Sequence, residues 1–326
     1  MIRPGDPLGH PLARAGLAAS AGPLLALMVA AVAFSLTTET FFSADNLSLL
    51  LEQSVVVGIL ALGQTMVVLT GGIDLGNGAI AVFGTILMAK HGGALGGATG
   101  LLMGLFVCSA LGTASGGLVA RLRLPPFIVT LGMLTVVSAA ARLYSQSRNY
   151  PVSAPLLTVF GKGLHLGSFS LAGGAALMLA AYALVGYALR QTTWGRHVYA
   201  IGGNAEAARL MGIRVDRTVT SVYAGAGLLY GMAAWAALGR IPNADANAYQ
   251  SANLDSITAV VIGGTSLFGG RGGVLGSLLG TLIVSVLRSG LTQAGIDALY
   301  QDVATGVLVI VAVAVDQASR RRQGRR

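Results

Sequence analysis

The chain has 326 residues, of which 54% are hydrophobic and only 10% are charged, and its mean hydropathy is +0.73. A soluble domain carries about 25% charged residues, so this composition excludes an ordinary soluble globular protein. The net charge of +9 does not indicate nucleic-acid binding, because the basic residues flank apolar runs and form no face with interleaved aromatic residues.

Apolar runs close to the length that crosses a bilayer recur along the chain. We expect an all-α, polytopic membrane helix bundle of about ten transmembrane segments, some of them short or broken. The 47 glycines favour close packing between these helices. The predicted spans cover residues 15–37, 53–70, 75–90, 98–120, 126–145, 169–190, 218–239, 254–267, 272–290 and 300–317. The second, third and eighth are short, which is typical of tilted, broken or re-entrant segments.

The spans form one predicted transmembrane domain over residues 15–317, with an N-terminal tail (1–14), a polar loop (191–217) and a basic C-terminal tail (318–326). Ten spans put both termini on one side, together with 15 of the 21 lysines and arginines. Because cytoplasmic loops are enriched in these residues, both termini and the polar loop are predicted to be cytoplasmic. The basic tail is interpreted as a topology signal, although such clusters also attract anionic lipids.

The first glycine-rich signature is LTGGIDLGNG at 69–78, where paired glycines allow a tight break between two spans. Asp74 is the one carboxylate placed deep between spans, and intramembrane charge is costly enough to suggest a role. The alternative is structural, with Asp74 capping the following helix and Asn77 assisting. The residues predicted to form the break or to line a translocation path here are Gln64, Thr65, Gly71, Gly72, Asp74 and Asn77. Gln64 and Thr65 could also bond across helices.

The longest outward segment, residues 146–168, contains Pro151 and Pro155, which argue against a span. It is either an ordered outer loop that meets a partner or substrate, or a plain connection.

The polar block at 195–217 interrupts an otherwise apolar chain. Its segment NAEAARLMG predicts a short helix with both ends marked: Asn204 can cap the first amides, and Gly212 can adopt the left-handed turn that ends a helix. Glu206 lies in the first turn, where the helix dipole favours an anion. We expect a docking helix for a soluble partner; the alternative is a solvated loop, since cytoplasmic loops are often basic.

The second glycine-rich signature is VIGGTSLFGG at 261–270, and its predicted path or break residues are Gly263, Gly264 and Thr265. Like the first signature, it ends an apolar run at a predicted inward turn. The pair is typical of an internal duplication in parallel orientation, a common ground plan for transporters.

Motifs for catalysis are missing from the sequence. There is no G-x-x-x-x-G-K-[ST], and the run GGTSLFGGRGG lacks the lysine that reaches phosphates. The four histidines have no metal-ligand spacing, and the single Cys108 lies in an apolar run. We therefore expect that the chain alone is not an enzyme and binds no cofactor or metal itself.

Three motifs resemble the membrane permease subunits of bacterial ABC importers for ribose, xylose, arabinose, rhamnose and related sugars. They are GGIDLG at 71–76, GRHVYAIGGNAEAARLMGI at 195–213 and VVIGGTSLFGGRGGVLGSLLGTL at 260–282, and the resemblance covers residues 45–317. The chain departs from the family in having Gly76 where serine is common after IDL, which puts the detail of that turn in doubt.

The resemblance implies a bacterial inner-membrane complex. Two permease subunits would form the path, two cytoplasmic ATPase subunits would carry ATP and Mg²⁺, and a periplasmic binding protein would deliver the sugar. It implies that the ATPase-coupling segment is formed by Gly202, Gly203, Asn204, Glu206, Ala207, Ala208, Arg209 and Gly212.

Two other classes remain open from the sequence. An ion-coupled secondary transporter would need an intramembrane ion carrier, and Asp74 is the only serious candidate. A channel-like protein without energy coupling would not need the capped cytoplasmic helix. Neither the sugar nor the choice between a homodimer and a heterodimer of permeases follows from the sequence.

Overall fold

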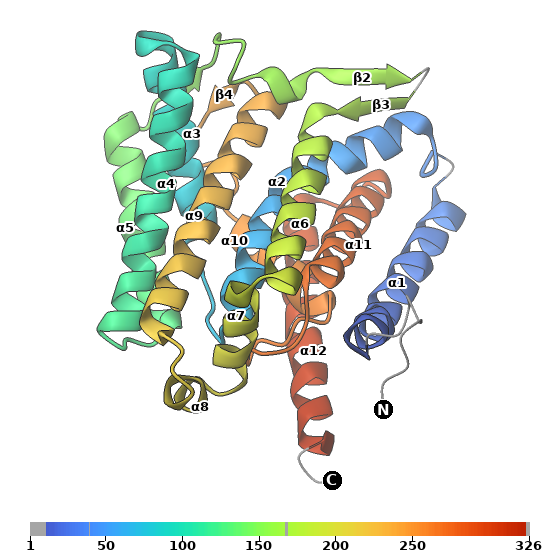
Figure 1. Cartoon of the computed structure of the whole chain (residues 1–326). Helices are drawn as coiled ribbons and strands as arrows, with labels where there is room; N and C mark the ends of the chain where they lie inside the picture. The colour runs from blue at the N-terminus through green and yellow to red at the C-terminus, as the bar shows by residue number, and fades with distance from the viewer. Residues whose placement is uncertain (1–10, 39, 167–168, 324–326) are drawn as a thin grey trace.

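The computed structural model describes residues 11–38, 40–166 and 169–323, and the described chain is a helix bundle (Figure 1). The helices are α1 (Pro11–Thr37), α2 (Ala44–Leu69), α3 (Asn77–Leu95), α4 (Gly97–Arg121), α5 (Pro126–Ser145), α6 (Gly173–Gln191), α7 (Thr193–Gly203), α8 (Ala205–Leu210), α9 (Val215–Arg240), α10 (Ala252–Ile262), α11 (Val274–Gln293) and α12 (Ala298–Gln323). The strands are β1 (Tyr150–Pro151), β2 (Gly163–Leu166), β3 (Phe169–Ala172) and β4 (Asn243–Ala244), with one 3-10 turn, η1 (Val159–Gly161).

Seven of the described helices are long and apolar enough to cross a membrane: α2, α3, α4, α5, α6, α9 and α11. Shorter apolar stretches lie in α1, α10 and α12, at Gly22–Thr37, Ala252–Ile262 and Ala298–Ala314. The prediction of an all-α membrane bundle with about ten apolar segments, some short, is confirmed.

Several predicted boundaries were wrong. The second span is not short: α2 has 26 residues because Ser43 caps it, accepting from the Asn46 amide at 3.2 Å. The third span begins at Asn77 and has 19 residues. The eighth, α10, is short as predicted, with 11 residues. Helix α12 continues to Gln323, so most of the predicted basic tail (318–326) is helical. Of the predicted N-terminal tail (1–14), only residues 11–14 lie in the described chain, and they belong to α1.

Helix α9 forms the centre of the bundle and packs against α4, α2 and α3. Its contact with α4 is close because both helices present glycines. A Cβ on Gly112 of α4 would collide with the carbonyl oxygen of Tyr223, and one on Gly227 of α9 would collide with that of Cys108. Such small-residue contacts let membrane helices gain dispersion energy without a large apolar side chain between them.

The segment between α5 and α6 is an ordered structure at one end of the bundle (Figure 1). Strand β1 pairs antiparallel with β4, and β2 pairs antiparallel with β3. The Trp235 indole at the end of α9 donates to the Leu156 carbonyl at 2.9 Å and stacks edge-on against Phe160 at 4.5 Å between ring centroids. Residues 146–166 therefore form an ordered loop, and residues 167–168 lie outside the described chain; that this loop faces outward and meets a partner or substrate stays a prediction.

Candidate functional site: the α7–α8 segment and two glycine turns

The short helix α8 is capped at both ends, as its sequence predicts. The Asn204 side chain accepts a hydrogen bond from the Ala207 amide at 2.9 Å. Gly212 has φ +85°, a left-handed conformation that a side chain would strain. An exposed ion pair of 3.3 Å between Arg209 and Asp216 adds a weak link to the start of α9. The helix therefore has a defined position at the end of the bundle opposite β2 and β3 (Figure 1).

The surface of α8 combines exposed polar and exposed apolar side chains. Glu206 and Arg209 are exposed, whereas Ala208 is fully buried against the rest of the chain. The largest exposed apolar side chains are Leu210, at 90% exposure, and Met211, at 72%. Sequence reasoning missed these two residues. The signal that could have identified them is a pair of large apolar residues directly before the glycine that ends the helix. Exposed apolar residues on a polar segment are typical of a protein-docking surface.

The end of α7 meets both glycine-rich turns, at a contact that we call the glycine junction and define as residues 69–72, 202–203 and 268–273. The Gly270 amide donates to the Leu69 carbonyl at 3.0 Å. A Cβ on Gly202 would collide with both partners of that bond. Three segments that the sequence singled out separately are therefore in direct backbone contact.

A tyrosine of α7 adds a side-chain bond to the glycine junction. The Tyr199 hydroxyl donates to the Gly272 carbonyl at 3.0 Å. Burial raises the pKa of this phenol above its ordinary value, while nearby Arg190 opposes the shift. Tyr199 therefore stays protonated at neutral pH and keeps its role as a donor.

The two glycine turns have the same hydrogen-bond pattern. After α2, Gly71 has φ +83°, and the Gly72 amide bonds back to the Val67 carbonyl at 3.2 Å. After α10, Gly264 has φ +82°, and the Thr265 amide bonds back to the Val260 carbonyl at 3.1 Å. Both are helix ends closed by a left-handed glycine. The end of α8 closes in the same way, with Gly212 at φ +85° and the Ile213 amide bonded to the Ala208 carbonyl, so this geometry is not specific to the two signatures and their internal duplication stays a prediction.

Asp74 lies on the segment between α2 and α3 and is buried, with 1% exposure. One of its carboxylate oxygens accepts from the Gly76 amide at 2.9 Å, and the other accepts from the Tyr230 hydroxyl of α9 at 3.0 Å. The side-chain amide of Gln64 lies against the Asp74 backbone, donating to its carbonyl at 2.9 Å and accepting from its amide at 3.1 Å. The expectation that Asp74 is the cap residue of α3 needs correction: the N-cap is Gly76, which has no side chain, and Asp74 bonds to the Gly76 amide from two residues earlier.

Asn77 links the start of α3 to α10. Its amide donates to the Ser256 hydroxyl at 2.7 Å, and its oxygen accepts from the Gly78 amide. On α10, the Asn253 amide reaches the Leu75 carbonyl at 3.4 Å. The first predicted break is therefore bonded to α10 by side chains, in addition to its backbone contact with the second glycine-rich turn at the glycine junction.

Three further predicted path residues, Thr65, Thr265 and Gly263, make close contacts within this chain. Thr65 is fully buried and donates at 2.6 Å to Ser277 of α11, so it bonds across helices. Thr265 accepts from the Gly273 amide at 3.3 Å and closes its own turn. Gly263 packs so tightly against Gly276 that a Cβ would collide with the Gly276 carbonyl. All three residues are buried.

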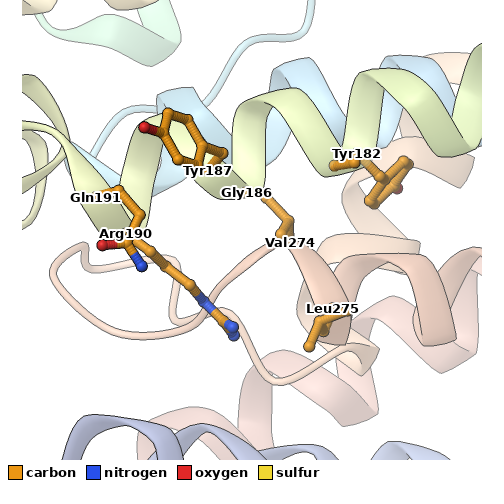
Figure 2. A pocket seen from close by; sticks show the side chains of 8 residues that line it. Tyr182, Gly186, Tyr187, Arg190, Gln191, Val274 and Leu275 are labelled. Atoms are coloured by element: carbon orange, nitrogen blue, oxygen red, sulfur yellow. The ribbon is translucent and has the colours of Figure 1, made fainter.

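A pocket of about 250 Å³ lies between α6 and α11, beside the glycine junction (Figure 2). Arg190 and Gln191 line it from the last turn of α6, and Val274 and Leu275 line it from the first turn of α11. Helix α11 therefore borders open space directly after the junction residues 268–273, and α6 borders it just before α7 begins.

Comparisons with known proteins agree on one family. Residues 46–313 match the family described as branched-chain amino acid transport system / permease component. The chain is 42% identical to a fructose import permease protein of Rhizobium meliloti over 306 residues, covering 91% of this chain and 85% of that protein. It is 35% identical to a ribose import permease protein of Bacillus subtilis over 312 residues, covering 93% and 94%.

A third relative is a galactose/methyl galactoside import permease protein of Escherichia coli, 33% identical over 313 residues, covering 90% of this chain and 92% of that protein. No solved structure matches the chain significantly. The family match spans most of the chain, including both glycine turns and the α7–α8 segment. The chain therefore belongs to the family of branched-chain amino acid transport system permease components, and it is a multi-pass membrane permease.

Proposed function

We propose that the chain is the permease subunit of an ATP-driven importer for a monosaccharide that a periplasmic binding protein delivers. Two copies of an ATPase subunit that carries ATP and Mg²⁺ bind at the α8 end, and a second permease subunit, identical or related, completes the path. Both termini and α8 face the cytoplasm of a bacterium, and the protein lies in its inner membrane. The family match and the sugar import permeases among the relatives support this assignment.

The observation that carries the proposal is the exposed end of α8 on a helix that is capped and joined to the bundle. Leu210 and Met211 present apolar surface, and burying one such side chain contributes about 1.5–3 kcal/mol. The ATPase subunit is the partner that would cover them. Glu206 and Arg209 form the polar rim of this docking surface.

The glycine junction gives the docked ATPase a mechanical connection to the membrane helices. When the two ATPase subunits close on ATP, they push on α8 and α7. Gly202 presses on the bond between Leu69 and Gly270, so the end of α2 and the loop between α10 and α11 move together. Because packed backbone contacts resist compression, a small displacement at α8 is passed on to the helices that it touches.

The predicted path residues take a positioning role in this proposal. Gln64, Asp74 and Asn77 fix the position of the segment between α2 and α3 relative to α9 and α10, beside the path. Asp74 serves this role as an acceptor, since both of its carboxylate oxygens accept hydrogen bonds. An ion carrier needs a carboxylate that can exchange its partner for a proton or a sodium ion, so this geometry favours ATP coupling over the ion-coupled alternative.

The test is co-purification of the tagged chain from its native membrane, with mass spectrometry of the proteins that accompany it. Wild type should bring an ATPase with a Walker motif, and Leu210→Asp should lose it. Leu122→Asp is the matched control, because Leu122 is an exposed leucine, at 62%, at the end of α4. Recovery of the ATPase with Leu210→Asp at wild-type yield would contradict docking through α8. A change at buried Ala208 would be less informative, since it would also disturb the fold.

A further inference from the structure

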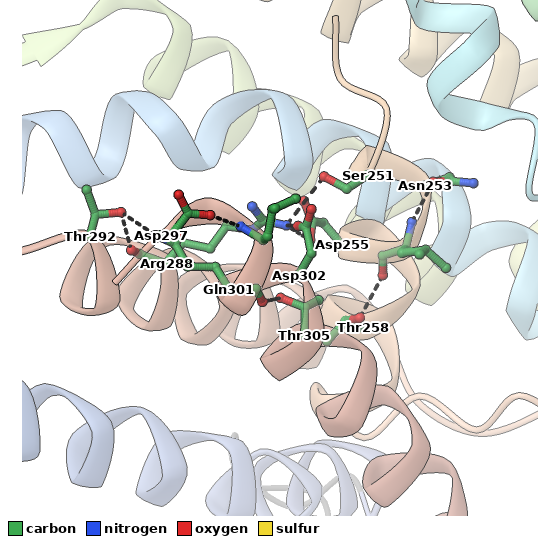
Figure 3. A network of polar contacts seen from close by, with 12 residues as sticks. Ser251, Asn253, Asp255, Thr258, Arg288, Thr292, Asp297, Gln301, Asp302 and Thr305 are labelled. Atoms are coloured by element: carbon green, nitrogen blue, oxygen red, sulfur yellow. Dashed lines mark hydrogen bonds and ion pairs between the residues drawn. The ribbon is translucent and has the colours of Figure 1, made fainter. Parts of the chain in front are cut away.

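A second polar cluster lies apart from the glycine junction, on α10, α11 and α12 (Figure 3). Arg288 of α11 is its centre. The guanidinium bonds to Asp255 of α10 at 2.7 Å and to Asp302 of α12 at 3.0 Å. We call Arg288, Asp255 and Asp302 the charged triad. The sequence carries no local signal for this cluster, because the two acidic partners of Arg288 lie 33 and 14 residues away from it.

The charged triad lies inside the ends of its helices. Arg288 is five residues, or about 8 Å, before the end of α11 at Gln293, and Asp302 is four residues after the start of α12. Charged side chains at such positions in membrane proteins face the protein interior or water, because exposure to lipid is costly.

One side of the charged triad is open. The Asp255 side chain is 6% exposed, whereas that of Arg288 is 26% exposed and that of Asp302 is 50% exposed. The buried Arg288 Nε has no hydrogen-bond partner, although the same guanidinium bonds two carboxylates through its Nη2. The triad thus presents part of the Arg288 guanidinium and half of the Asp302 side chain at the surface, while the Arg288 Nε stays buried beneath them.

The backbone around the triad is irregular as well as polar. Helix α10 begins at Ala252 after a loop in which Tyr249 has φ +55°, a conformation rare for a residue with a side chain. The Ser251 hydroxyl in this loop lies 3.4 Å from the Arg288 guanidinium. Irregular backbone at membrane depth is tolerated where it is buried in protein or lines a water-filled cavity.

We propose that the charged triad is a contact site for the ring hydroxyls of a monosaccharide on the outward part of the translocation path. The inference rests on the proposed function. Each sugar hydroxyl both donates and accepts, and a guanidinium beside carboxylates supplies both kinds of partner with charge-assisted strength. The sugar competes with the ion pairs for these groups, so it is held weakly enough to leave, as conduction requires.

Helix α10 connects this site to the ATPase end. Asp255 lies in its first turn, and the turn with Gly263 and Gly264 at its other end leads into the glycine junction. The helix has 11 residues and is about 16 Å long. A movement at the junction therefore shifts Asp255 relative to Arg288 and changes the sugar contact during the transport cycle.

The test uses right-side-out vesicles that contain the complete transporter. Uptake of radiolabelled D-fructose, D-ribose and D-galactose identifies a sugar that the wild type imports. Uptake of that sugar is then compared with uptake of each of its monodeoxy analogues, which lack one hydroxyl. The preference ratio of a variant is its uptake of the parent sugar divided by its uptake of an analogue. The binding protein contributes the same factor to this ratio in every variant, so its contribution cancels when two variants are compared.

Asp302→Asn is expected to reduce the preference for the parent sugar over at least one analogue by about threefold to tenfold, the loss of one charge-assisted hydrogen bond. Asp302→Glu should restore much of that preference. Asp297→Asn, a nearby exposed carboxylate at the start of α12, is the matched control and should keep the wild-type ratios, because asparagine also caps helices.

If Asp302→Asn leaves every preference ratio unchanged, the inference is overturned. This holds also if uptake of all the sugars falls by the same factor because less of the complex assembles. That result would make the triad a structural clamp. Failure of the wild-type vesicles to import any monosaccharide would instead contradict the proposed function, and this inference with it.

Discussion

The Gly270 amide and the Leu69 carbonyl are joined by a 3.0 Å hydrogen bond, which connects the turn after α10 to the end of α2. Gly202 of α7 packs directly on this bond. A residue at the end of α7 therefore touches both the end of α2 and the loop between α10 and α11. The predictions below ask what these close contacts contribute to stability and to coupling.

The first prediction concerns the contact between α10 and α11. Gly280→Ala would place a Cβ against the Ala259 carbonyl, where there is no space, so the two helices must separate. We expect a loss of about 1–3 kcal/mol in stability, visible as a lower thermal unfolding midpoint in detergent. Gly306→Ala on α12 meets nothing within 4 Å and should be neutral or slightly stabilising. An equal shift for the two variants would contradict the packing argument.

The second prediction separates the structural role of Asp74 from ion transport. Asp74→Asn keeps an acceptor for the Gly76 amide and a partner for the Tyr230 hydroxyl, so uptake should persist at every pH tested. Asp74→Leu leaves both groups unpaired in the interior and should cost at least about 2 kcal/mol in stability. The measurement is uptake against pH, together with the yield of folded protein. Folded Asp74→Asn without uptake at any pH would favour the ion-coupled alternative.

The third prediction concerns the cap of α8. Asn204→Ala removes the acceptor for the Ala207 amide and should weaken the helix by about 1 kcal/mol. Hydrogen exchange at α8 should then become faster, while exchange in α9 stays unchanged. Asn204→Asp retains an acceptor and should exchange like wild type. Identical exchange in Asn204→Ala would show that α8 is held by other contacts.

Much of the fold was predictable because the dominant signals are local. Apolar runs marked the bundle and its approximate number of segments, and Asn204 and Gly212 marked the limits of α8. The start of α2 was missed because its first turns are polar and follow a serine cap, which lies outside a hydropathy pattern.

The candidate site was predictable in its parts but not in its assembly. The sequence identified the two glycine signatures and the α7–α8 segment, yet no local signal says that Gly202 packs on the bond between Leu69 and Gly270. That contact depends on how three distant segments pack. The charged triad was missed for the same reason, since Arg288 of α11 lies 33 residues after Asp255 of α10, with the loop between the two helices in the interval.

The most direct measurement of the central claim compares ATP hydrolysis and sugar uptake by the complete transporter in proteoliposomes carrying Gly202→Ala. The added methyl group displaces the Leu69–Gly270 bond but leaves the exposed surface of α8 unchanged. Gly117→Ala, on α4 with nothing within 4 Å, is the control. The account predicts that Gly202→Ala still assembles and hydrolyses ATP but imports much less sugar per ATP, while Gly117→Ala behaves like wild type. An unchanged ratio of sugar imported to ATP hydrolysed in Gly202→Ala would contradict it.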